Sequence, residues 1–456
     1  MSPGRKATLA LLGADAVSLA VILNGMAWAR GVHPHGGLIV EPLLVPFFGL
    51  VAALYLIDGY KLQTDMLSVD YASQHTLAIL LAGAGTLLVT FVLIPVGYPL
   101  QSSRAALALT FLLLIPATLI VRRVLHWRYR DSQQQRSIVF IGDHASAQAL
   151  KDEWVRFKMR QPLLIARGQS GTTAPMAQAG VVPPVFSELL ERMRRRELAV
   201  EAIVLRESNR EVSAETSQQL VDLYFGGIPT YTLELFHQVY WRKIPLYRLN
   251  QTWLFQEGFR VAREPVFERI KRASDIGFSL AGLVLLSPLC LLIGLLVALE
   301  DRGSVFFTQT RIGKFRTPFR LHKFRTMRPA ADGDPYAQPG DMRVTRIGRW
   351  LRASRLDELP QLWNVLRGEM SLIGPRAEWD RLVEKYDREI PSYHVRHLVR
   401  PGITGWAQVN YPYGANLEDT QRKLEYDLYY IRHFSFTLDA SIVLKTINVM
   451  LFGRGR

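Results

Sequence analysis

The sequence predicts three parts: an α-helical membrane bundle at the N-terminus, a small Rossmann-like α/β domain in the middle, and an α-rich mixed domain with a re-entrant membrane helix. Four apolar runs fill residues 1–130, and a strand–turn–helix pattern opens residues 131–263. Residues 264–456 begin with a further apolar run, 276–299, which a Ser-Pro pair interrupts. A hydrophobic content of 49% beside 21% charged residues fits separate membrane and soluble parts.

The N-terminal apolar runs predict four membrane-spanning helices, because about 20 apolar residues cross a bilayer. These runs are residues 7–29, 42–57, 76–100 and 105–121, and the second is the shortest. Basic residues precede the first run, occur at Lys61 in the second loop and follow the fourth run, so we expect both ends of the block in the cytoplasm. Asp15 interrupts the first run. An acid inside a membrane helix is often functional, but a contact with the interface or a neighbouring helix explains it equally well.

Charge and cysteine content limit the function classes. The net charge of +15 and a pI of about 9.9 suit an anionic partner, which could be nucleic acid, a lipid surface or a phosphorylated substrate. The single cysteine, Cys290, lies inside the apolar run of the C-terminal part. An intrachain disulfide and a cysteine-based metal site are therefore excluded.

The middle part has a small α/β pattern. Residues 137–141 predict a buried strand that is followed by Gly142, Asp143 and a helical stretch, and we expect further strands at 201–205 and 228–233. The start is typical of a dinucleotide-binding unit. However, the turn has one glycine where the phosphate-binding fingerprint has three, which argues against nucleotide binding. We expect this domain to regulate the protein or to form oligomers.

The apolar run 276–299 predicts a membrane helix that bends at Ser287-Pro288. Pro288 cannot donate a hydrogen bond to the carbonyl of Val284, so the helix should kink there. The hydroxyl of Ser287 can take up a freed carbonyl. Basic residues flank the run on both sides, including Arg302, which favours a re-entrant hairpin with both ends in the cytoplasm. A Pro-kinked spanning helix fits the hydrophobicity equally well.

After this run, aromatic residues alternate with Arg and Lys over residues 305–327, a pattern typical of strands. Alternation of this kind can bind single-stranded nucleic acid. Its position beside a membrane anchor makes anionic lipid headgroups or a diphosphate the better partners.

Asp357 and Glu358 form an adjacent acid pair among many arginines. Two carboxylates can hold a divalent metal against a diphosphate while guanidinium groups neutralise the remaining charge. Pro360 predicts a helix start just after the pair. An acid pair that caps a helix and neutralises surface arginines explains the pattern equally well. The basic segments also offer candidate phosphate-binding residues: Lys323, Arg325, Arg346, Arg352 and Arg376.

Residues 271–452 resemble the bacterial sugar transferase family, the monotopic polyprenyl-phosphate glycosyl-1-phosphate transferases, and the whole chain resembles its large membrane-anchored members. The matching motifs are KRASDIGFSLAGLVLLSPL, VFFTQTRIGKFRTPFRLHKFRTM, RVTRIGRWLRASRLDELPQLWNVLRGEMSLIGPR, RPGITGWAQVN and YDLYYIRHFSFTLD. The resemblance implies that Ser287 and Pro288 break a re-entrant helix and that Asp357 and Glu358 are catalytic. It also places Arg352 and Arg376 at positions that contact phosphate or nucleotide.

The resemblance further implies that a sugar 1-phosphate passes from a UDP-sugar to undecaprenyl phosphate, with Mg²⁺ held by Asp357 and Glu358 and with release of UMP. This reaction would be the first membrane step of exopolysaccharide or O-antigen-type polysaccharide synthesis, at the bacterial inner membrane with the catalytic domain in the cytoplasm. A covalent aspartyl phosphosugar is expected, and only the resemblance selects Asp357 as nucleophile. One departure is Pro375-Arg376-Ala377, where the family often has Pro-Arg-Pro, so we expect a less constrained loop.

Two alternatives belong to other function classes. A non-catalytic membrane scaffold for a polysaccharide assembly complex would not need the acid pair and its arginines. A membrane-tethered nucleic acid binder would show salt-dependent affinity, and we expect no nucleic acid partner. UDP-sugar, undecaprenyl phosphate and membrane lipids are the expected partners. A homo-oligomer is compatible with the sequence, which does not identify the sugar.

Overall fold

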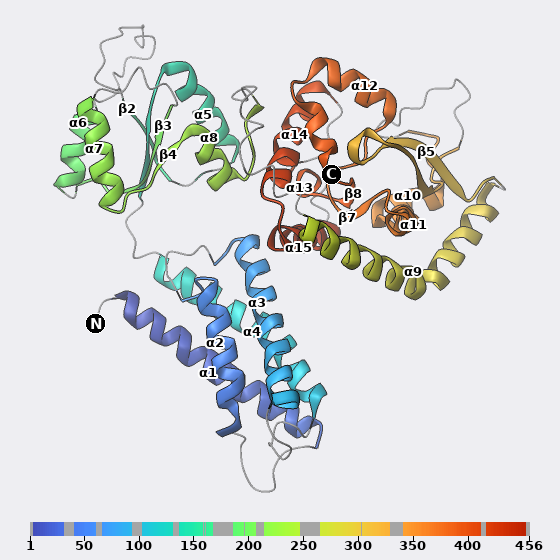
Figure 1. Ribbon diagram of the computed structural model, residues 1–456, viewed down its shortest axis with the longest axis horizontal. Coiled ribbons are helices and arrows are strands. Elements are labelled where there is room, and N and C mark those ends of the chain that lie inside the picture. The colour runs from blue at the N-terminus through green and yellow to red at the C-terminus, as the bar shows by residue number, and fades with distance from the viewer. Residues whose placement is uncertain are drawn as a thin grey trace. The chain divides into compact units, whose positions relative to one another are not determined.

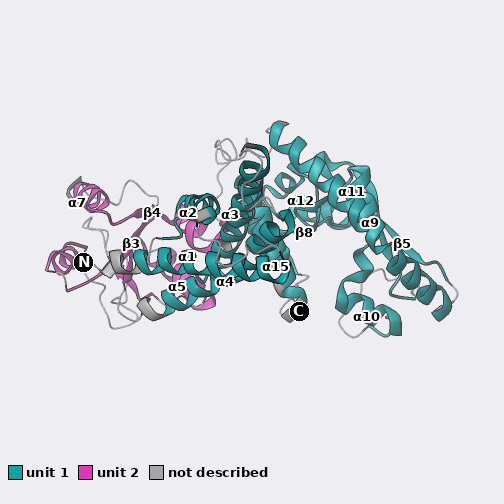
Figure 2. Cartoon of the chain, turned by 90° about the horizontal axis from the view of Figure 1, so that it is seen from below, with its two compact units in different colours: residues 1–130, 256–456 teal, residues 131–255 magenta. Residues whose placement is uncertain are grey.

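The computed structural model describes residues 3–31, 41–60, 66–93, 103–130, 136–157, 159, 161–166, 186–195, 197–206, 214–246, 265–301, 303–328, 341–411 and 416–452. Lys61 and Arg302, used above to orient the membrane segments, lie outside these ranges. The chain divides into two compact units (Figure 2). Residues 131–255 form one unit, and residues 1–130 together with 256–456 form the other.

The N-terminal block is helical throughout its described residues. It contains α1 (Pro3–Ala29), a 3-10 turn η1 (Glu41–Leu43), α2 (Leu44–Leu56), α3 (Val69–Leu88) with its π-helical extension η2 (Val89–Leu93), and α4 (Arg104–Arg130). Helix α1 packs on α4, and α3 packs on both α2 and α4 (Figure 1). Leucines such as Leu50, Leu54 and Leu114 are fully buried between them. Apolar side chains at helical spacing thus supply the core of the block.

The second helix is shorter than expected. Three helices of this block contain stretches long and apolar enough to cross a membrane, namely residues 8–29, 71–92 and 104–127. Helix α2 has 13 residues, which at 1.5 Å per residue is about 20 Å and less than the ~30 Å hydrocarbon layer. The helix is shorter than the apolar run 42–57 at both ends, because residues 41–43 form a 3-10 turn and Asp58 has a left-handed φ of 57°.

Asp15 contacts a neighbouring helix. Arg122 of α4 donates from both of its terminal nitrogens to the two carboxylate oxygens of Asp15, each at 2.7 Å. The Tyr60 hydroxyl donates to Asp15 Oδ2 at 2.8 Å. Both charged residues are fully buried, so this pair fixes α1 against α4 by a bidentate ion pair.

The middle unit is a small α/β domain with a parallel sheet (Figure 1). Its strands are β1 (Ser137–Ile141), β2 (Leu163–Ala166), β3 (Val200–Leu205) and β4 (Thr230–Thr232), in the order β2-β1-β3-β4. Its helices are α5 (His144–Arg156), α6 (Phe186–Arg194), α7 (Ala214–Phe225), α8 (Leu233–Phe236) and the π-helix η5 (His237–Trp241). The predicted strands are confirmed as β1, β3 and a shorter β4. Strand β2, which has only four residues, was not predicted.

A protein carboxylate occupies the N-terminus of α5. Asp143 accepts a hydrogen bond from Ser146 N at 3.0 Å and forms an ion pair with Arg206 at the end of β3. A side chain on Gly142 would come within 2.7 Å of the Phe140 ring, so this glycine serves close packing. The Asp143 carboxylate thus caps the N-terminus of α5.

The C-terminal part contains a long helix, α9, followed by short strands and helices. The elements are α9 (Pro265–Asp301), β5 (Phe306–Ile312), η10 (Lys314–Arg316), β6 (Pro318–Phe324), α10 (Arg346–Ser354), η11 (Leu356–Glu358), α11 (Gln361–Arg367), β7 (Ser371–Ile373), α12 (Asp380–Glu389), η12 (Tyr393–Leu398), β8 (Gly402–Thr404), α13 (Trp406–Asn410), α14 (Leu417–Arg432) and α15 (Phe436–Phe452). Strands β5 and β6 form an antiparallel hairpin, and β7 pairs with β8 in parallel. Within this unit α15 also packs against α3.

Helix α9 continues through Pro288 and is bent near its middle (Figure 1). The Ser287 hydroxyl donates to Val284 O at 2.8 Å, as predicted. Pro288 has no backbone N–H and cannot donate a hydrogen bond to this carbonyl. Leu285 and Leu291 are each 76% exposed, and the outer face of the helix is apolar.

Both arms of α9 contact the C-terminal domain. On the first arm, Lys271 forms a 2.5 Å ion pair with Asp439 of α15. On the second arm, Ile293 and Val297 pack in one cluster with Phe324 of β6 and Leu351 of α10.

Candidate active site

The acid pair lies in a sharp turn between two helices. Arg355 ends α10 with a left-handed φ of 60°. Residues 356–358 then form one 3-10 turn, and α11 begins at Gln361 after Pro360, as the sequence predicted. The left-handed residue reverses the chain direction and places Asp357 and Glu358 between the helices.

Glu358 is paired with Lys323. The Nζ atom of Lys323, on β6, donates to Glu358 Oε1 at 2.7 Å, and both side chains are largely buried. Burial alone would raise the pKa of Glu358, but the charges of Lys323 and Arg376 outweigh burial and hold this pKa below its usual range. Glu358 is therefore ionised at neutral pH.

Asp357 has a different environment from its neighbour. Only 8% of the residue is exposed, and its carboxylate makes no hydrogen bond with any residue that the structure describes. Burial raises the pKa of Asp357 above its usual range, although the charges of Lys323 and Arg352 oppose this effect. The dyad thus contains one carboxylate tied to a lysine and one with open lone pairs.

Arg376 and Lys323 share a small pocket with Glu358. The pocket is lined by Arg311, Leu321, Lys323, Glu358, Gln361, Met370, Arg376, Ala377, Gly402 and Ile403. Cations and one carboxylate form part of its wall, and aliphatic side chains form the rest. Such a pocket suits a charged ligand that also has a less polar part.

The loop that carries Arg376 is held by hydrogen bonds. Gly402 N donates to Pro375 O at 2.8 Å, and Arg396 donates to Arg376 O at 3.0 Å. Arg311 donates to Ala377 O at 3.0 Å, and Ala377 is buried. These three hydrogen bonds constrain the loop without a proline at position 377, and the effect of the absent proline ring stays a prediction.

The other predicted phosphate-binding residues have different environments. The charge of Arg352 acts on Asp357, and its Nε donates to Thr326 Oγ1 at 2.9 Å. The guanidinium of Arg325 lies against the backbone of Gly303. Arg346 is exposed at the N-terminus of α10, where its backbone N–H donates to Glu300 at 2.7 Å. The charges of Lys323, Arg352 and Arg376 thus act on the dyad, whereas Arg325 and Arg346 have other contacts.

A buried ion pair that was not predicted from the sequence contacts the backbone of Arg376. Arg396 is buried and donates to Asp427 from Nε at 3.1 Å and from Nη2 at 2.8 Å. It also donates to the hydroxyl of Tyr393 at 2.8 Å. Because the same guanidinium holds the Arg376 carbonyl, this buried pair positions the loop of Arg376. Arg396 and Asp427 are 31 residues apart, and no sequence motif indicates that they form a pair.

The dyad fits Mg²⁺ only with help from a substrate. Among the described residues there is no group of three or more His, Cys, Asp or Glu side chains that could hold a metal ion. Mg²⁺ commonly binds one or two protein carboxylates together with substrate phosphates and water. Asp357, with open lone pairs, and the second oxygen of Glu358 satisfy that requirement.

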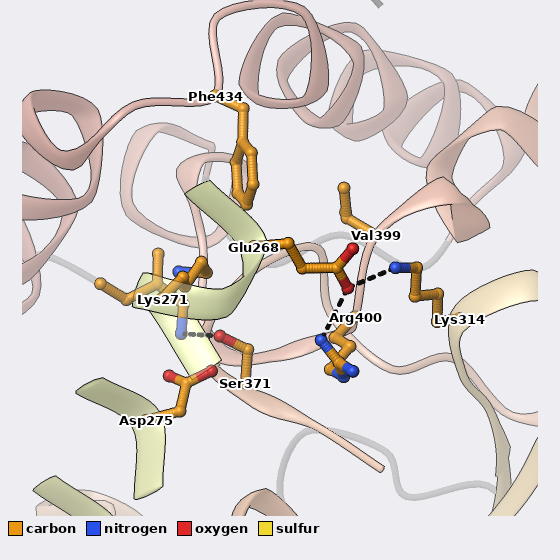
Figure 3. Close-up of a pocket in the computed structure, with 9 residues that line it drawn as sticks. Glu268, Lys271, Asp275, Lys314, Ser371, Val399, Arg400 and Phe434 are labelled. Carbon is orange, nitrogen blue, oxygen red and sulfur yellow. Dashed lines mark hydrogen bonds and ion pairs between the residues drawn. The ribbon is translucent and has the colours of Figure 1, made fainter. Parts of the chain in front are cut away.

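A second pocket lies beside the start of α9 (Figure 3). Glu268 accepts hydrogen bonds from Lys314 at 2.5 Å and from Arg400 at 2.9 Å. Lys271 pairs with Asp439, and Asp275 accepts from the backbone of Leu372. The charged side chains here already have partners within the protein, and these contacts hold α9 against the C-terminal domain.

The part of the chain that carries the dyad is similar to a known protein family. The sequence model described as bacterial sugar transferase matches residues 266–453. A UDP-N-acetylgalactosamine-undecaprenyl-phosphate N-acetylgalactosaminephosphotransferase of Aeromonas hydrophila is 40% identical over 269 residues, which are 59% of this chain and 63% of that protein.

Two further relatives act on glucose according to their names. A UDP-glucose:undecaprenyl-phosphate glucose-1-phosphate transferase of Escherichia coli K12 is 43% identical over 182 residues, 39% of each chain. A protein of the same name from Caulobacter vibrioides is 43% identical over 185 residues, 40% of this chain and 69% of that protein. The chain thus spans less than two thirds of the first two relatives. It belongs to the bacterial sugar transferase family.

Proposed function

We propose that this protein transfers a sugar 1-phosphate from a UDP-sugar to undecaprenyl phosphate and releases UMP. The observation that carries the proposal is the dyad: Asp357 with open lone pairs beside Glu358, which is paired with Lys323. The family model matches the part of the chain that contains the dyad, and relatives named as transferases of this kind are 40% and 43% identical to the chain over the matched residues. In a cell this reaction would begin exopolysaccharide or O-antigen-type polysaccharide synthesis.

The chemistry proceeds in two displacements at phosphorus. A carboxylate oxygen of Asp357 attacks the β-phosphorus of the UDP-sugar, the bond to the bridging oxygen breaks, and UMP leaves with that oxygen. A phosphate oxygen of undecaprenyl phosphate then attacks the same phosphorus, and the Asp357 carboxylate leaves. Each step brings together one anion and one phosphoryl centre, so the two phosphorylated substrates never have to share the site.

The neighbouring residues have separate tasks in this scheme. Lys323 keeps Glu358 ionised, and Arg376 and Arg352 stabilise negative charge on the phosphoryl oxygens. When bound by Asp357 and Glu358, Mg²⁺ would reduce the repulsion between the carboxylate and the donor phosphates.

We further propose that α9 is re-entrant and that the site faces the cytoplasm at the inner membrane. Both arms of α9 contact the same domain, the first through Lys271 and the second through Glu300. A straight helix of 37 residues would be about 55 Å long, and the bend near Pro288 supports a path in which both arms stay against one domain (Figure 1). The exposed outer face of residues 276–299 supplies apolar surface for the lipid.

The middle domain is proposed to be a Rossmann-like module without a catalytic role. Its parallel sheet supports the first part, and the Asp143 carboxylate at the N-terminus of α5 supports the second. A truncated chain beginning at residue 264 should keep some transferase activity in detergent. Complete loss of activity from a folded, membrane-bound truncation would contradict this role.

The test of the proposed function is a donor panel. Full-length protein in detergent is mixed with undecaprenyl phosphate, Mg²⁺ and one radiolabelled UDP-sugar at a time. Label should enter the lipid phase with at least one donor, and UMP should appear in equal amount. Transfer with no member of the panel, by protein that melts cooperatively, would reject the proposal in favour of a scaffold.

A further inference from the structure

One polar side chain in the dyad pocket has no role in the chemistry above. Gln361 is the first residue of α11, three residues after Glu358, and lines the same pocket. Only 3% of the residue is exposed. Within the part of the chain that the structure describes, its side-chain amide has no hydrogen-bond partner.

Asn364, the next residue of α11 with a side-chain amide, is by contrast fully hydrogen-bonded. Asn364 is fully buried, and its Nδ2 donates to Arg320 O and to Glu369, both at 2.7 Å. Its Oδ1 accepts from His322 N at 3.1 Å. Every side-chain polar atom of Asn364 is thus hydrogen-bonded, to β6 or to Glu369. Asn364 therefore has a structural role, whereas the described residues give the Gln361 amide none.

The pocket around Gln361 limits what could satisfy its amide. Leu321, Met370 and Ile403 form an aliphatic part of the wall, and Glu358 and Arg376 lie at the polar part. The pocket thus offers a polar wall and an aliphatic wall next to the dyad.

We propose that Gln361 recognises the sugar of the donor through hydrogen bonds from its amide to a ring hydroxyl or acylamino group. This inference rests on the proposed function. The sugar is bonded through one oxygen to the β-phosphorus that Asp357 attacks, whereas the uracil is separated from it by a ribose and the α-phosphate. The ring that can lie against Glu358 is therefore the sugar. A neutral amide gives and accepts hydrogen bonds, which is what sugar hydroxyl groups require.

The test compares Gln361→Met with the wild type in the full chain. Methionine has a similar volume and removes the amide. The KM for the UDP-sugar in UMP release should rise about 10- to 100-fold, as expected when a polar substrate group meets no partner. The affinity for UDP, which lacks the sugar, should stay within about twofold of the wild type. Without donor, the variant should melt at or above the wild-type temperature, because an unpaired amide has been replaced by an apolar group.

Asn364→Leu is the matched structural control. It should lower the melting temperature, because its hydrogen-bonded partners lose an amide, and any stable fraction should keep the wild-type KM. An unchanged KM in Gln361→Met would overturn the inference while leaving the proposed function intact. An equal loss of UDP affinity would place the contact on the nucleotide and also overturn it. If wild-type protein consumes no UDP-sugar, the proposed function has failed first.

Discussion

Lys323 donates a hydrogen bond to Glu358 across 2.7 Å, and this contact separates the two members of the acid pair. Glu358 is held by a cation, whereas Asp357 makes no hydrogen bond with the residues that the structure describes. Adjacent carboxylates in one turn therefore have different electrostatic environments, and different roles can follow from them.

Replacing Lys323 with Met should move the acidic limb of the pH profile to higher pH. In the wild type, the lowered pKa of Glu358 keeps it ionised, and this pair stabilises the folded state above the ordinary pKa of 4.5. That stability is lost as the pH falls through the folded-state pKa. Without Lys323, burial raises the pKa of Glu358, so the carboxylate takes up a proton at higher pH. The measurement is the pH dependence of UMP release, with Lys323→Arg as a control that should largely restore the profile. Superimposable profiles of the Met variant and the wild type would contradict this account.

Replacing Pro288 with Ala should straighten α9 and reduce activity roughly 10- to 100-fold, because the second arm would carry Glu300 away from α10.

Single cysteines at Val266 and Ser304, both exposed, can be labelled in a Cys290→Ser background. In the parent chain both positions should react from the cytoplasmic side only. Periplasmic labelling at position 304 of the parent would show that α9 spans the membrane.

Removing one partner of the Asp15–Arg122 pair should destabilise the N-terminal block. Asp15→Ala leaves the fully buried Arg122 guanidinium unpaired, which costs about 3–5 kcal/mol. The melting temperature in detergent should drop, and the double variant Asp15→Leu with Arg122→Leu should recover most of the loss. Asp152→Ala, at an exposed position, is the surface control. Equal melting temperatures for Asp15→Ala and the wild type would mean that the pair does not hold α1 to α4.

The sequence predicted elements whose signals are local. Strands β1, β3 and β4 follow from apolar runs, the start of α11 follows from Pro360, and the Ser287 contact with Val284 follows from the chemistry of a helix that contains proline. The dyad was selected because both carboxylates are adjacent in one motif.

Features that depend on tertiary contacts were not predicted. Arg396 and Asp427 are two of many charged residues in the sequence, and only the fold brings them behind Arg376. The hydrogen bonds that hold the Arg376 loop were not predicted for the same reason, since they come from Arg396 and Gly402. The length of α2 was overestimated because hydropathy does not report the backbone turn at Asp58.

The central claim is that Asp357 is the nucleophile of a two-step transfer, and a single-turnover experiment without lipid tests it most directly. Full-length protein is mixed with the UDP-sugar identified in the donor panel and with Mg²⁺, in the absence of undecaprenyl phosphate. We predict a burst of UMP of about one equivalent per active site, and a mass increase of one phosphosugar on the peptide that contains Asp357. Asp357→Asn should abolish both signals. If UMP appears only when undecaprenyl phosphate is present, and no adduct on Asp357 can be trapped, transfer is direct and Asp357 is not the nucleophile.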